Sequence, residues 1–270
     1  MIAKVHLPRA QAENHFLNEL RLAASFLTIL PLIDRRRPAS HEAVARSFAW
    51  FPVVGLAIGV ALAAADWLLA YLLGQVIRSV LIVASLVVVT GGIHLDGLAD
   101  TADALGAGRD RERALEILRD SRVGTFGASA IFFDLTLKIV ALSTLAGYPR
   151  YAALIVAPML ARYSMTLVGL GIPYLRESGA GSTLLNAHGS QRMAGMTMCG
   201  MILVMSILLP PWQRFAVTLG VAFAIVIAMQ LFYRRWLGGV TGDLIGACGE
   251  LVEIAVLLVM SAGPYFTLTG

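Results

Sequence analysis

The chain has 270 residues, of which 58% are hydrophobic and 14% are charged, and its formal net charge is +4. A soluble domain usually carries about 25% charged and about 45–50% apolar residues, so this composition excludes an ordinary soluble protein. It predicts one integral-membrane domain over residues 1–270. The two cysteines, Cys199 and Cys248, indicate neither a disulfide framework nor a thiolate metal site. The polar start lacks a long apolar core, so we expect no cleavable signal peptide.

Apolar runs predict the membrane spans, because a helix needs roughly 20 apolar residues to cross the ~30 Å hydrocarbon core. Residues 20–33 form a shorter run that contains Pro31, and we expect a re-entrant or interfacial segment there. The fold class is therefore all-α, a polytopic membrane helix bundle. The seven predicted spans are 49–73, 77–95, 126–146, 151–172, 194–211, 214–233 and 244–262.

Arginines are unevenly distributed between the connections. The opposite connections hold only Arg78, Arg150 and Arg214. Because basic residues accumulate in cytoplasmic loops, we expect a multi-pass protein of the cell inner membrane with the four richer segments in the cytoplasm. Those segments are 34–46, 106–125, 176–192 and 234–235.

An acidic cluster follows the second predicted span, in the stretch GGIHLDGLADTADALG at 91–106. Asp96, Asp100 and Asp103 have the spacing i, i+4 and i+7, which places them on one helical face. Three neighbouring carboxylates repel one another unless a cation lies between them, and Mg²⁺ takes carboxylate oxygens together with substrate phosphates. The alternative is solvated charges at a helix end. His94, just before the cluster, is a general base, a phosphate donor or an interfacial histidine.

A basic segment continues from the cluster over 107–127. Its apolar residues recur at helical spacing over 114–118, which predicts a short amphipathic helix at the membrane surface. Four polar residues then lead into the next span. Guanidinium groups and a helix N-terminus both suit phosphate oxygens, so the segment predicts a pyrophosphate clamp that faces the acidic helix. The four residues are Arg119, Asp120, Ser121 and Arg122.

Charged residues also occur inside the predicted spans. Asp134 and Lys138 are four residues apart, which indicates either a structural ion pair or a lysine directed at substrate phosphates. Arg162 has no acid in its own helix, so we expect it to face a polar interior, an acid on another helix or a ligand.

The last predicted span begins with GGVTGDLIGACGE at 238–250. Thr241 or Asp243 is suited to cap this helix. Glu250 and Glu253 lie deeper on roughly the same face as Asp243, which predicts a second acidic wall opposite the first cluster.

Three blocks together resemble the cobalamin synthases, the adenosylcobinamide-GDP ribazoletransferases. They are GGIHLDGLADTAD at 91–103, DSRVGTFG at 120–127 and GGVTGDLIGACGE at 238–250. FLTILPL at 26–32 and RSFAWFPVVGLAIG at 46–59 are also similar to family features, so the resemblance spans nearly the whole chain. The loop at 173–193 departs from the family pattern, which leaves its substrate contacts open.

The resemblance implies a reaction and a cofactor. It implies that adenosylcobinamide-GDP is joined to α-ribazole or its 5′-phosphate, that GMP is released and that Mg²⁺ is required. With the residue patterns above, it assigns three roles. The catalytic residues are His94, Asp96, Asp100, Asp103 and Lys138. The substrate-binding residues are Arg119, Asp120, Ser121, Arg122, Arg162, Thr241 and Asp243. The metal ligands are Asp96, Asp100, Asp103 and Glu250.

Two other functions stay open on the residues alone. A membrane phosphotransferase that uses CDP-activated alcohols also carries aspartates at helical spacing, but only the Asp96-Gly97 start of its usual pattern is present. An ion-coupled transporter would use the buried charges, although the acids concentrate at a membrane boundary and no inverted repeat is visible. We expect a lipid bilayer and no nucleic acid as partners, and leave a homo-oligomer open.

Overall fold

The computed structural model describes residues 9–32, 41–108, 110–120, 122–175 and 188–262. These residues form helices and contain no strand, apart from one isolated bridge between Tyr174 and Val240. The prediction of an all-α polytopic bundle is confirmed. The elements are α1 (Arg9–Leu27), α2 (His41–Ser47), the 3-10 helix η1 (Phe48–Trp50), α3 (Phe51–Leu69), α4 (Gln75–Thr90), α5 (Ile93–Leu105), α6 (Arg111–Ile117), α7 (Thr125–Thr144), α8 (Gly147–Val168), α9 (His188–Leu208), α10 (Trp212–Trp236) and α11 (Gly242–Ser261).

Five helical stretches in the described part of the chain are long and apolar enough to cross a membrane. They are Glu42–Leu69, α7, α8, α10 and α11, and α4 with α5 would make a sixth if the bent pair is one span. The apolar part of α9 that the structure describes, Thr197–Leu208, is shorter than a span. The predicted count of seven therefore stays a prediction, whereas the multi-pass architecture is clear.

The predicted span 77–95 is wrong at its end, because the helix stops at Thr90 and the chain turns by 90° into α5. Gly91 and Gly92 make this turn with φ values of +66° and +68°. Glycine adopts this left-handed conformation without the steric cost that a side chain would add. The apolar character continues through the turn, so hydropathy alone did not reveal it.

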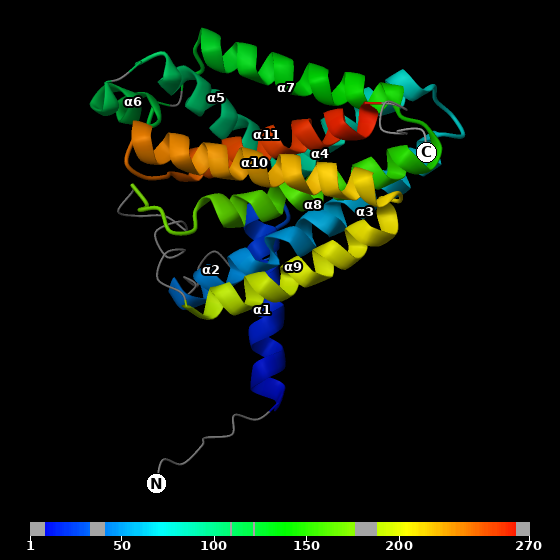
Figure 1. Ribbon diagram of the computed structural model, residues 1–270, viewed down its shortest axis with the longest axis horizontal. Coiled ribbons are helices and arrows are strands. Elements are labelled where there is room, and N and C mark those ends of the chain that lie inside the picture. The colour runs from blue at the N-terminus through cyan, green and yellow to red at the C-terminus, as the bar shows by residue number, and fades with distance from the viewer. Residues whose placement is uncertain (1–8, 33–40, 109, 121, 176–187, 263–270) are drawn as a thin grey trace.

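The N-terminal segment also differs in detail from the predicted element at 20–33. Helix α1 begins earlier and ends at Leu27, and residues 28–32 are not helical. The amide of Ile29 donates a hydrogen bond of 2.9 Å to the carbonyl of Val89, near the end of α4. In Figure 1, α1 runs steeply across the long helices rather than along them.

The long helices lie nearly parallel in layers, with α7 above α11 and α10, and with α8, α3 and α9 below (Figure 1). Helix α8 is central, and most of its residues are buried. It packs against α3 with the backbones in contact, because a Cβ at Gly55 would lie 2.5 Å from the Pro158 carbonyl oxygen and one at Gly59 would lie 2.7 Å from that of Leu154. Small residues let membrane helices approach this closely.

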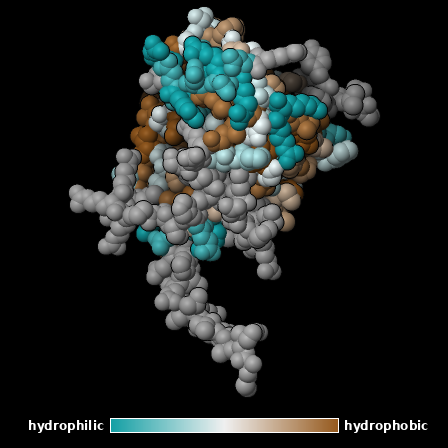
Figure 2. Space-filling model, turned by 90° about the vertical axis from the view of Figure 1, so that its left-hand side faces the viewer, coloured by the Kyte–Doolittle hydropathy of each residue, from teal (hydrophilic) through white to brown (hydrophobic). Residues whose placement is uncertain are grey.

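The predicted basic segments gather at one end of the bundle. Helices α2 and α6, the start of α9 and the end of α10 all lie toward the left of Figure 1. Figure 2 looks onto this end and shows hydrophilic side chains gathered over its upper part, with hydrophobic ones along the sides. The same end carries α5 and the start of α7, so the structure places the candidate site on the polar end of the bundle.

Candidate functional site

Helix α5, which carries the acidic cluster, packs directly on the first turns of α11. A Cβ at Gly97 would lie 2.7 Å from the backbone oxygen of Asp243, and one at Gly246 would lie 3.2 Å from the Cα of His94. The side chain of Thr241 caps α11 by accepting from the amide of Leu244 at 3.4 Å. Gly97 and Asp243 are 146 residues apart in the sequence, yet their backbones are in contact. The first and third sequence blocks therefore lie side by side.

Asp103 reaches across to the start of α7. Its carboxylate accepts hydrogen bonds from the amides of Gly124, at 2.7 Å, and Gly127, at 2.8 Å. These are the N-cap and N3 amides of α7, the two donors that a capping box satisfies with two separate side chains. Glycine is needed at both positions, because a Cβ would lie 2.5 Å from Asp103 Oδ1 at 124 and 2.3 Å from Oδ2 at 127. Two of the α7 amides that we expected to suit phosphate thus already bind a carboxylate.

The two other aspartates of the cluster remain near the surface of the polar end. Asp96 is exposed and Asp100 is half-buried, one turn apart on α5. No group of three or more His, Cys, Asp or Glu side chains within the described residues is arranged to hold a metal ion. Mg²⁺, however, commonly takes one or two carboxylates and completes its shell with water and substrate phosphates. The pair Asp96 and Asp100 fits that requirement, whereas Asp103 is engaged with α7.

The predicted phosphate clamp lies in the connection between α6 and α7. Arg122 binds Asp120 with Nη2 at 2.6 Å from Oδ2, and the arginine side chain is 87% exposed. This hydrogen bond lowers the pKa of Asp120 below its ordinary value. Arg119 is exposed as well, and Ser121 lies outside the described residues. The arrangement leaves guanidinium groups at the polar end, where they are accessible to an anionic substrate.

Lys138 lies inside the bundle and holds two carboxylates. Its Nζ is 3.0 Å from Asp134 Oδ2 and forms a second, short ion pair with Glu250. The predicted structural pair on α7 is thus present, and it is extended to α11. Glu250 lies two turns, roughly 10 Å, beyond Asp243 along α11. The structure therefore places Glu250 with Lys138 rather than among the α5 aspartates.

Arg162 of α8 pairs with Glu253 of α11, and both side chains are almost fully buried. Of the three surroundings expected for Arg162, the structure thus shows an acid on another helix. His94 is also buried, at 7% exposure, and its Nδ1 has no hydrogen-bond partner among the described residues. Glu250 and Glu253 thus pair with cations of α7 and α8. The predicted acidic wall opposite the α5 aspartates is therefore wrong, because neighbouring helices neutralise both glutamates.

Sequence reasoning missed a second ionic cluster, centred on Asp66 near the end of α3. Arg150 binds both oxygens of this carboxylate, at 2.6 and 2.9 Å, and also donates to Ser79 Oγ at 3.0 Å. Arg78 adds a third contact at 2.7 Å. Arg78 and Arg150 had been assigned to loops, yet Arg150 is only 1% exposed. The one signal was Asp66 itself, a lone acid in an apolar run.

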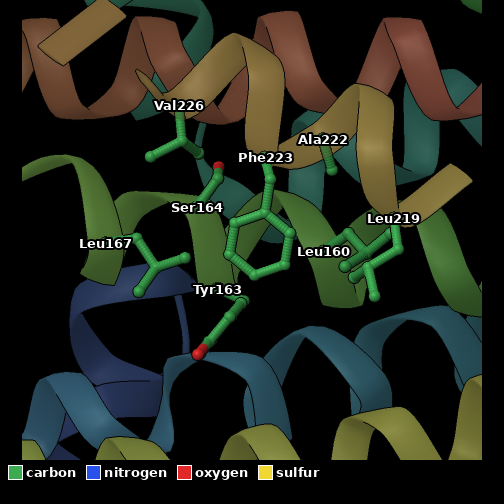
Figure 3. A pocket seen from close by; sticks show the side chains of 8 residues that line it. All are labelled: Leu160, Tyr163, Ser164, Leu167, Leu219, Ala222, Phe223 and Val226. Carbon is green, nitrogen blue, oxygen red and sulfur yellow. The ribbon is translucent and has the colours of Figure 1, made fainter.

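A pocket of about 200 Å³ lies between α8 and α10, away from these charges. Figure 3 shows that apolar side chains such as Leu160, Leu219 and Phe223 surround it, with the hydroxyls of Tyr163 and Ser164 at its margin. It is too small and too apolar for a nucleotide-activated substrate, so the polar end remains the candidate site.

Comparisons with known proteins identify a family that includes all three sequence blocks. The model of one family, cobalamin-5-phosphate synthase, matches residues 19–261. The chain belongs to this family. It is 39% identical over 238 residues to the adenosylcobinamide-GDP ribazoletransferase of Syntrophobacter fumaroxidans, covering 87% of this chain and 94% of that protein. It is 36% identical over 246 residues to the protein of that name from Geotalea daltonii, covering 89% and 96%. No solved structure matches the chain.

Membership of the cobalamin-5-phosphate synthase family makes the chain a transferase of cobalamin biosynthesis. This decides between the functions that the residues alone left open. The buried charges that suggested a transporter, Lys138 and Arg162, are paired within the bundle.

Proposed function

We propose that this protein joins adenosylcobinamide-GDP to α-ribazole or its 5′-phosphate and releases GMP at the polar end of the bundle. The observation that carries the proposal is the meeting of α5, the start of α11 and the connection before α7, because it brings carboxylates and guanidinium groups to one place. A ribose hydroxyl attacks the phosphorus on the cobinamide side, and the bond from that phosphorus to the GMP oxygen breaks. The hydroxyl proton leaves to a base or to solvent.

We assign Mg²⁺ to Asp96 and Asp100, which supply the hard oxygen ligands that this ion prefers. When bound, the ion supplies charge neutralisation to the pyrophosphate. The remaining work falls to the chain itself. Arg119 and Arg122 bind phosphate oxygens through planar guanidinium groups, and Arg122 exchanges its contact with Asp120 for the substrate. Charge developing on the GMP oxygens is then stabilised by donors that are already positioned.

The other predicted site residues act around this centre. Asp103 holds the start of α7, and with it the connection that carries Arg122, so we assign it a positioning role. Lys138 and Glu250 tie α7 to α11 from within the bundle. Thr241 and Asp243 lie at the first turn of α11, beside Gly97, where α-ribazole can approach the acidic face. His94 lies behind this face and is the base candidate closest in sequence to the aspartates.

We further propose that the protein resides in the cell inner membrane, with the polar end in the cytoplasm. The basic residues of α2, α6 and the end of α10 support this orientation. The nucleotide-activated substrate would then reach the site from the aqueous side, while the apolar flanks in Figure 2 face the bilayer.

The test is an activity assay in liposomes with adenosylcobinamide-GDP, α-ribazole and Mg²⁺, in which GMP release is measured. We expect Asp96→Asn and Asp100→Asn to lower turnover by orders of magnitude, with more residual activity at high Mg²⁺. Asp110→Asn, in the cap of α6, is the matched control and should retain turnover. If the wild type moves corrinoid across sealed vesicles without making GMP, the proposal is wrong. A CDP-activated alcohol as the preferred donor would likewise refute it.

A further inference from the structure

An open groove lies where the connection from α5 to α6 meets the last turn of α10. It has a volume of about 780 Å³ and is lined by Leu105, Gly108, Phe232, Arg235 and Trp236. Trp236 Nε1 donates to the carbonyl oxygen of Gly108 at 3.2 Å, which fixes one wall against the other. The groove shares no lining residue with the assigned site.

The groove combines an aromatic floor with a single cation. The rings of Phe232 and Trp236 are stacked, with centroids 5.2 Å apart and an interplanar angle of 26°. Arg235 is exposed and forms no hydrogen bond or ion pair with any residue that the structure describes. Its neighbour Arg234 instead donates to the carbonyl of Gly171 at 2.5 Å. The groove therefore offers one unneutralised guanidinium group beside apolar surface.

The groove lies at a membrane boundary. Helix α10 has 25 residues, more than the roughly 20 that the hydrocarbon core requires. Its basic residues lie only near its two ends, with Arg214 in the first turn and Arg234 and Arg235 in the last. The apolar side chains just before that turn face outward, with Ile227 54% and Leu231 46% exposed. Aromatic rings and arginines at such a position lie at the depth of the lipid headgroups.

We propose that this groove binds the headgroup phosphate of an anionic phospholipid. Arg235 would bind the phosphate, the Phe232 and Trp236 rings would pack against the glycerol and first methylenes, and Leu105, which is 48% exposed, would border the acyl chain. A nucleotide is the less suitable occupant, because its base edge needs hydrogen-bond partners and the indole N–H of Trp236 is already used by Gly108.

Binding at this groove also bears on the position of α6. Arg111 Nε donates to the carbonyl of Leu237 at 2.8 Å, so the first residue of α6 is also joined to the end of α10. A lipid seated between them would stabilise the connection from α5 to α6 without touching Asp96 or Asp100.

The experiment uses the full-length protein in nanodiscs that contain phosphatidylglycerol and phosphatidylcholine, and counts the lipids retained on release into detergent by native mass spectrometry. We expect the wild type to retain phosphatidylglycerol preferentially. A basic residue near an anionic surface contributes about 1 kcal/mol, so Arg235→Gln should reduce this preference about fivefold. Arg113→Gln is the control, because Arg113 is exposed on α6 and paired with Glu116, and it should leave the preference unchanged.

Three outcomes would overturn the proposal. The wild type could retain the two lipids equally, or Arg235→Gln could keep the wild-type preference. Added GDP could also displace the retained lipid, which would make the groove a nucleotide site. If Arg235→Gln does not fold, Trp236→Leu tests the same wall, and it should lower retention. The readout needs no turnover, so it is independent of the outcome of the GMP-release assay.

Discussion

The cap that Asp103 provides for α7 makes a prediction that separates positioning from metal binding. Asp103→Ala removes the acceptor of both the Gly124 and Gly127 amides. Loss of a cap costs up to about 2 kcal/mol, and this cap is a charged carboxylate with two donors, so we expect a value near that limit. Because 1.4 kcal/mol is a factor of ten, amide exchange over 124–128 should accelerate about 30-fold.

The informative comparison is Asp103→Asn, because asparagine keeps one carbonyl oxygen and is itself a good capping residue. We expect exchange over 124–128 to accelerate only about fivefold, corresponding to about 1 kcal/mol. Turnover should fall far less than in Asp96→Asn. Hydrogen exchange followed by mass spectrometry in detergent would measure the first effect, and GMP release the second.

Asp110→Ala is a matched control, since Asp110 caps α6 by accepting from the amide of Arg113 at 3.0 Å. It should accelerate exchange in α6 and leave 124–128 unchanged. The reasoning is refuted if Asp103→Ala leaves exchange at 124–128 at the wild-type rate. It is also refuted if Asp103→Asn keeps that protection but loses turnover by orders of magnitude, because Asp103 would then act on metal or substrate.

Four further predictions follow from the charged residues. Arg122→Lys keeps the charge but loses the planar guanidinium group. The value of kcat should fall by a factor on the order of 10², while KM for α-ribazole stays within twofold of wild type. An unchanged kcat would show that Arg122 is not part of the phosphate clamp. Lys138→Met leaves buried carboxylates unpaired and should destabilise the fold by about 3–5 kcal/mol. The double variant Lys138→Met with Glu250→Gln should recover part of this stability. Thermal unfolding in detergent measures both effects, and no recovery in the double variant would contradict the pairing. Asp66→Asn should destabilise by a similar amount and leave both KM values unchanged, which steady-state kinetics on the folded fraction would check. Glu112→Cys should resist an impermeant thiol reagent in intact cells and react in lysed ones, and labelling in intact cells would invert the proposed orientation.

The spans that the sequence predicted well are those whose stability is local. Helices α7 and α8 and the last helix, α11, each begin within a few residues of the predicted position, because a run of about 20 apolar residues needs no partner to define it. The same reasoning failed at Gly91 and Gly92. Backbone conformation, rather than hydropathy, ends α4 there, and a glycine pair in an apolar stretch is compatible with either a straight or a turned chain.

The candidate site shows the same division. The spacing of Asp96, Asp100 and Asp103 correctly predicted a shared face of α5. It could not indicate that the last of them meets the amides of α7, since the contact joins residues 21 and 24 positions apart, with α6 between them. Arg162 was predicted to face a polar interior, an acid on another helix or a ligand, and Glu253 was identifiable as its partner only once the helices were packed. Asp66 was missed because its partners lie on two other helices.

The buried ion pairs also set an order of events during synthesis. Arg162 and Glu253 are 91 residues apart, and Arg162 has no other ion-pair partner among the described residues. At about 5–20 residues per second, roughly 5 to 18 s pass between translation of Arg162 and of Glu253. Over that interval α8 carries an unneutralised guanidinium group, which is costly in hydrocarbon. Its release into lipid is therefore favoured only after α11 has emerged, so the insertion machinery must shelter the earlier helices until the last one brings its counter-charge.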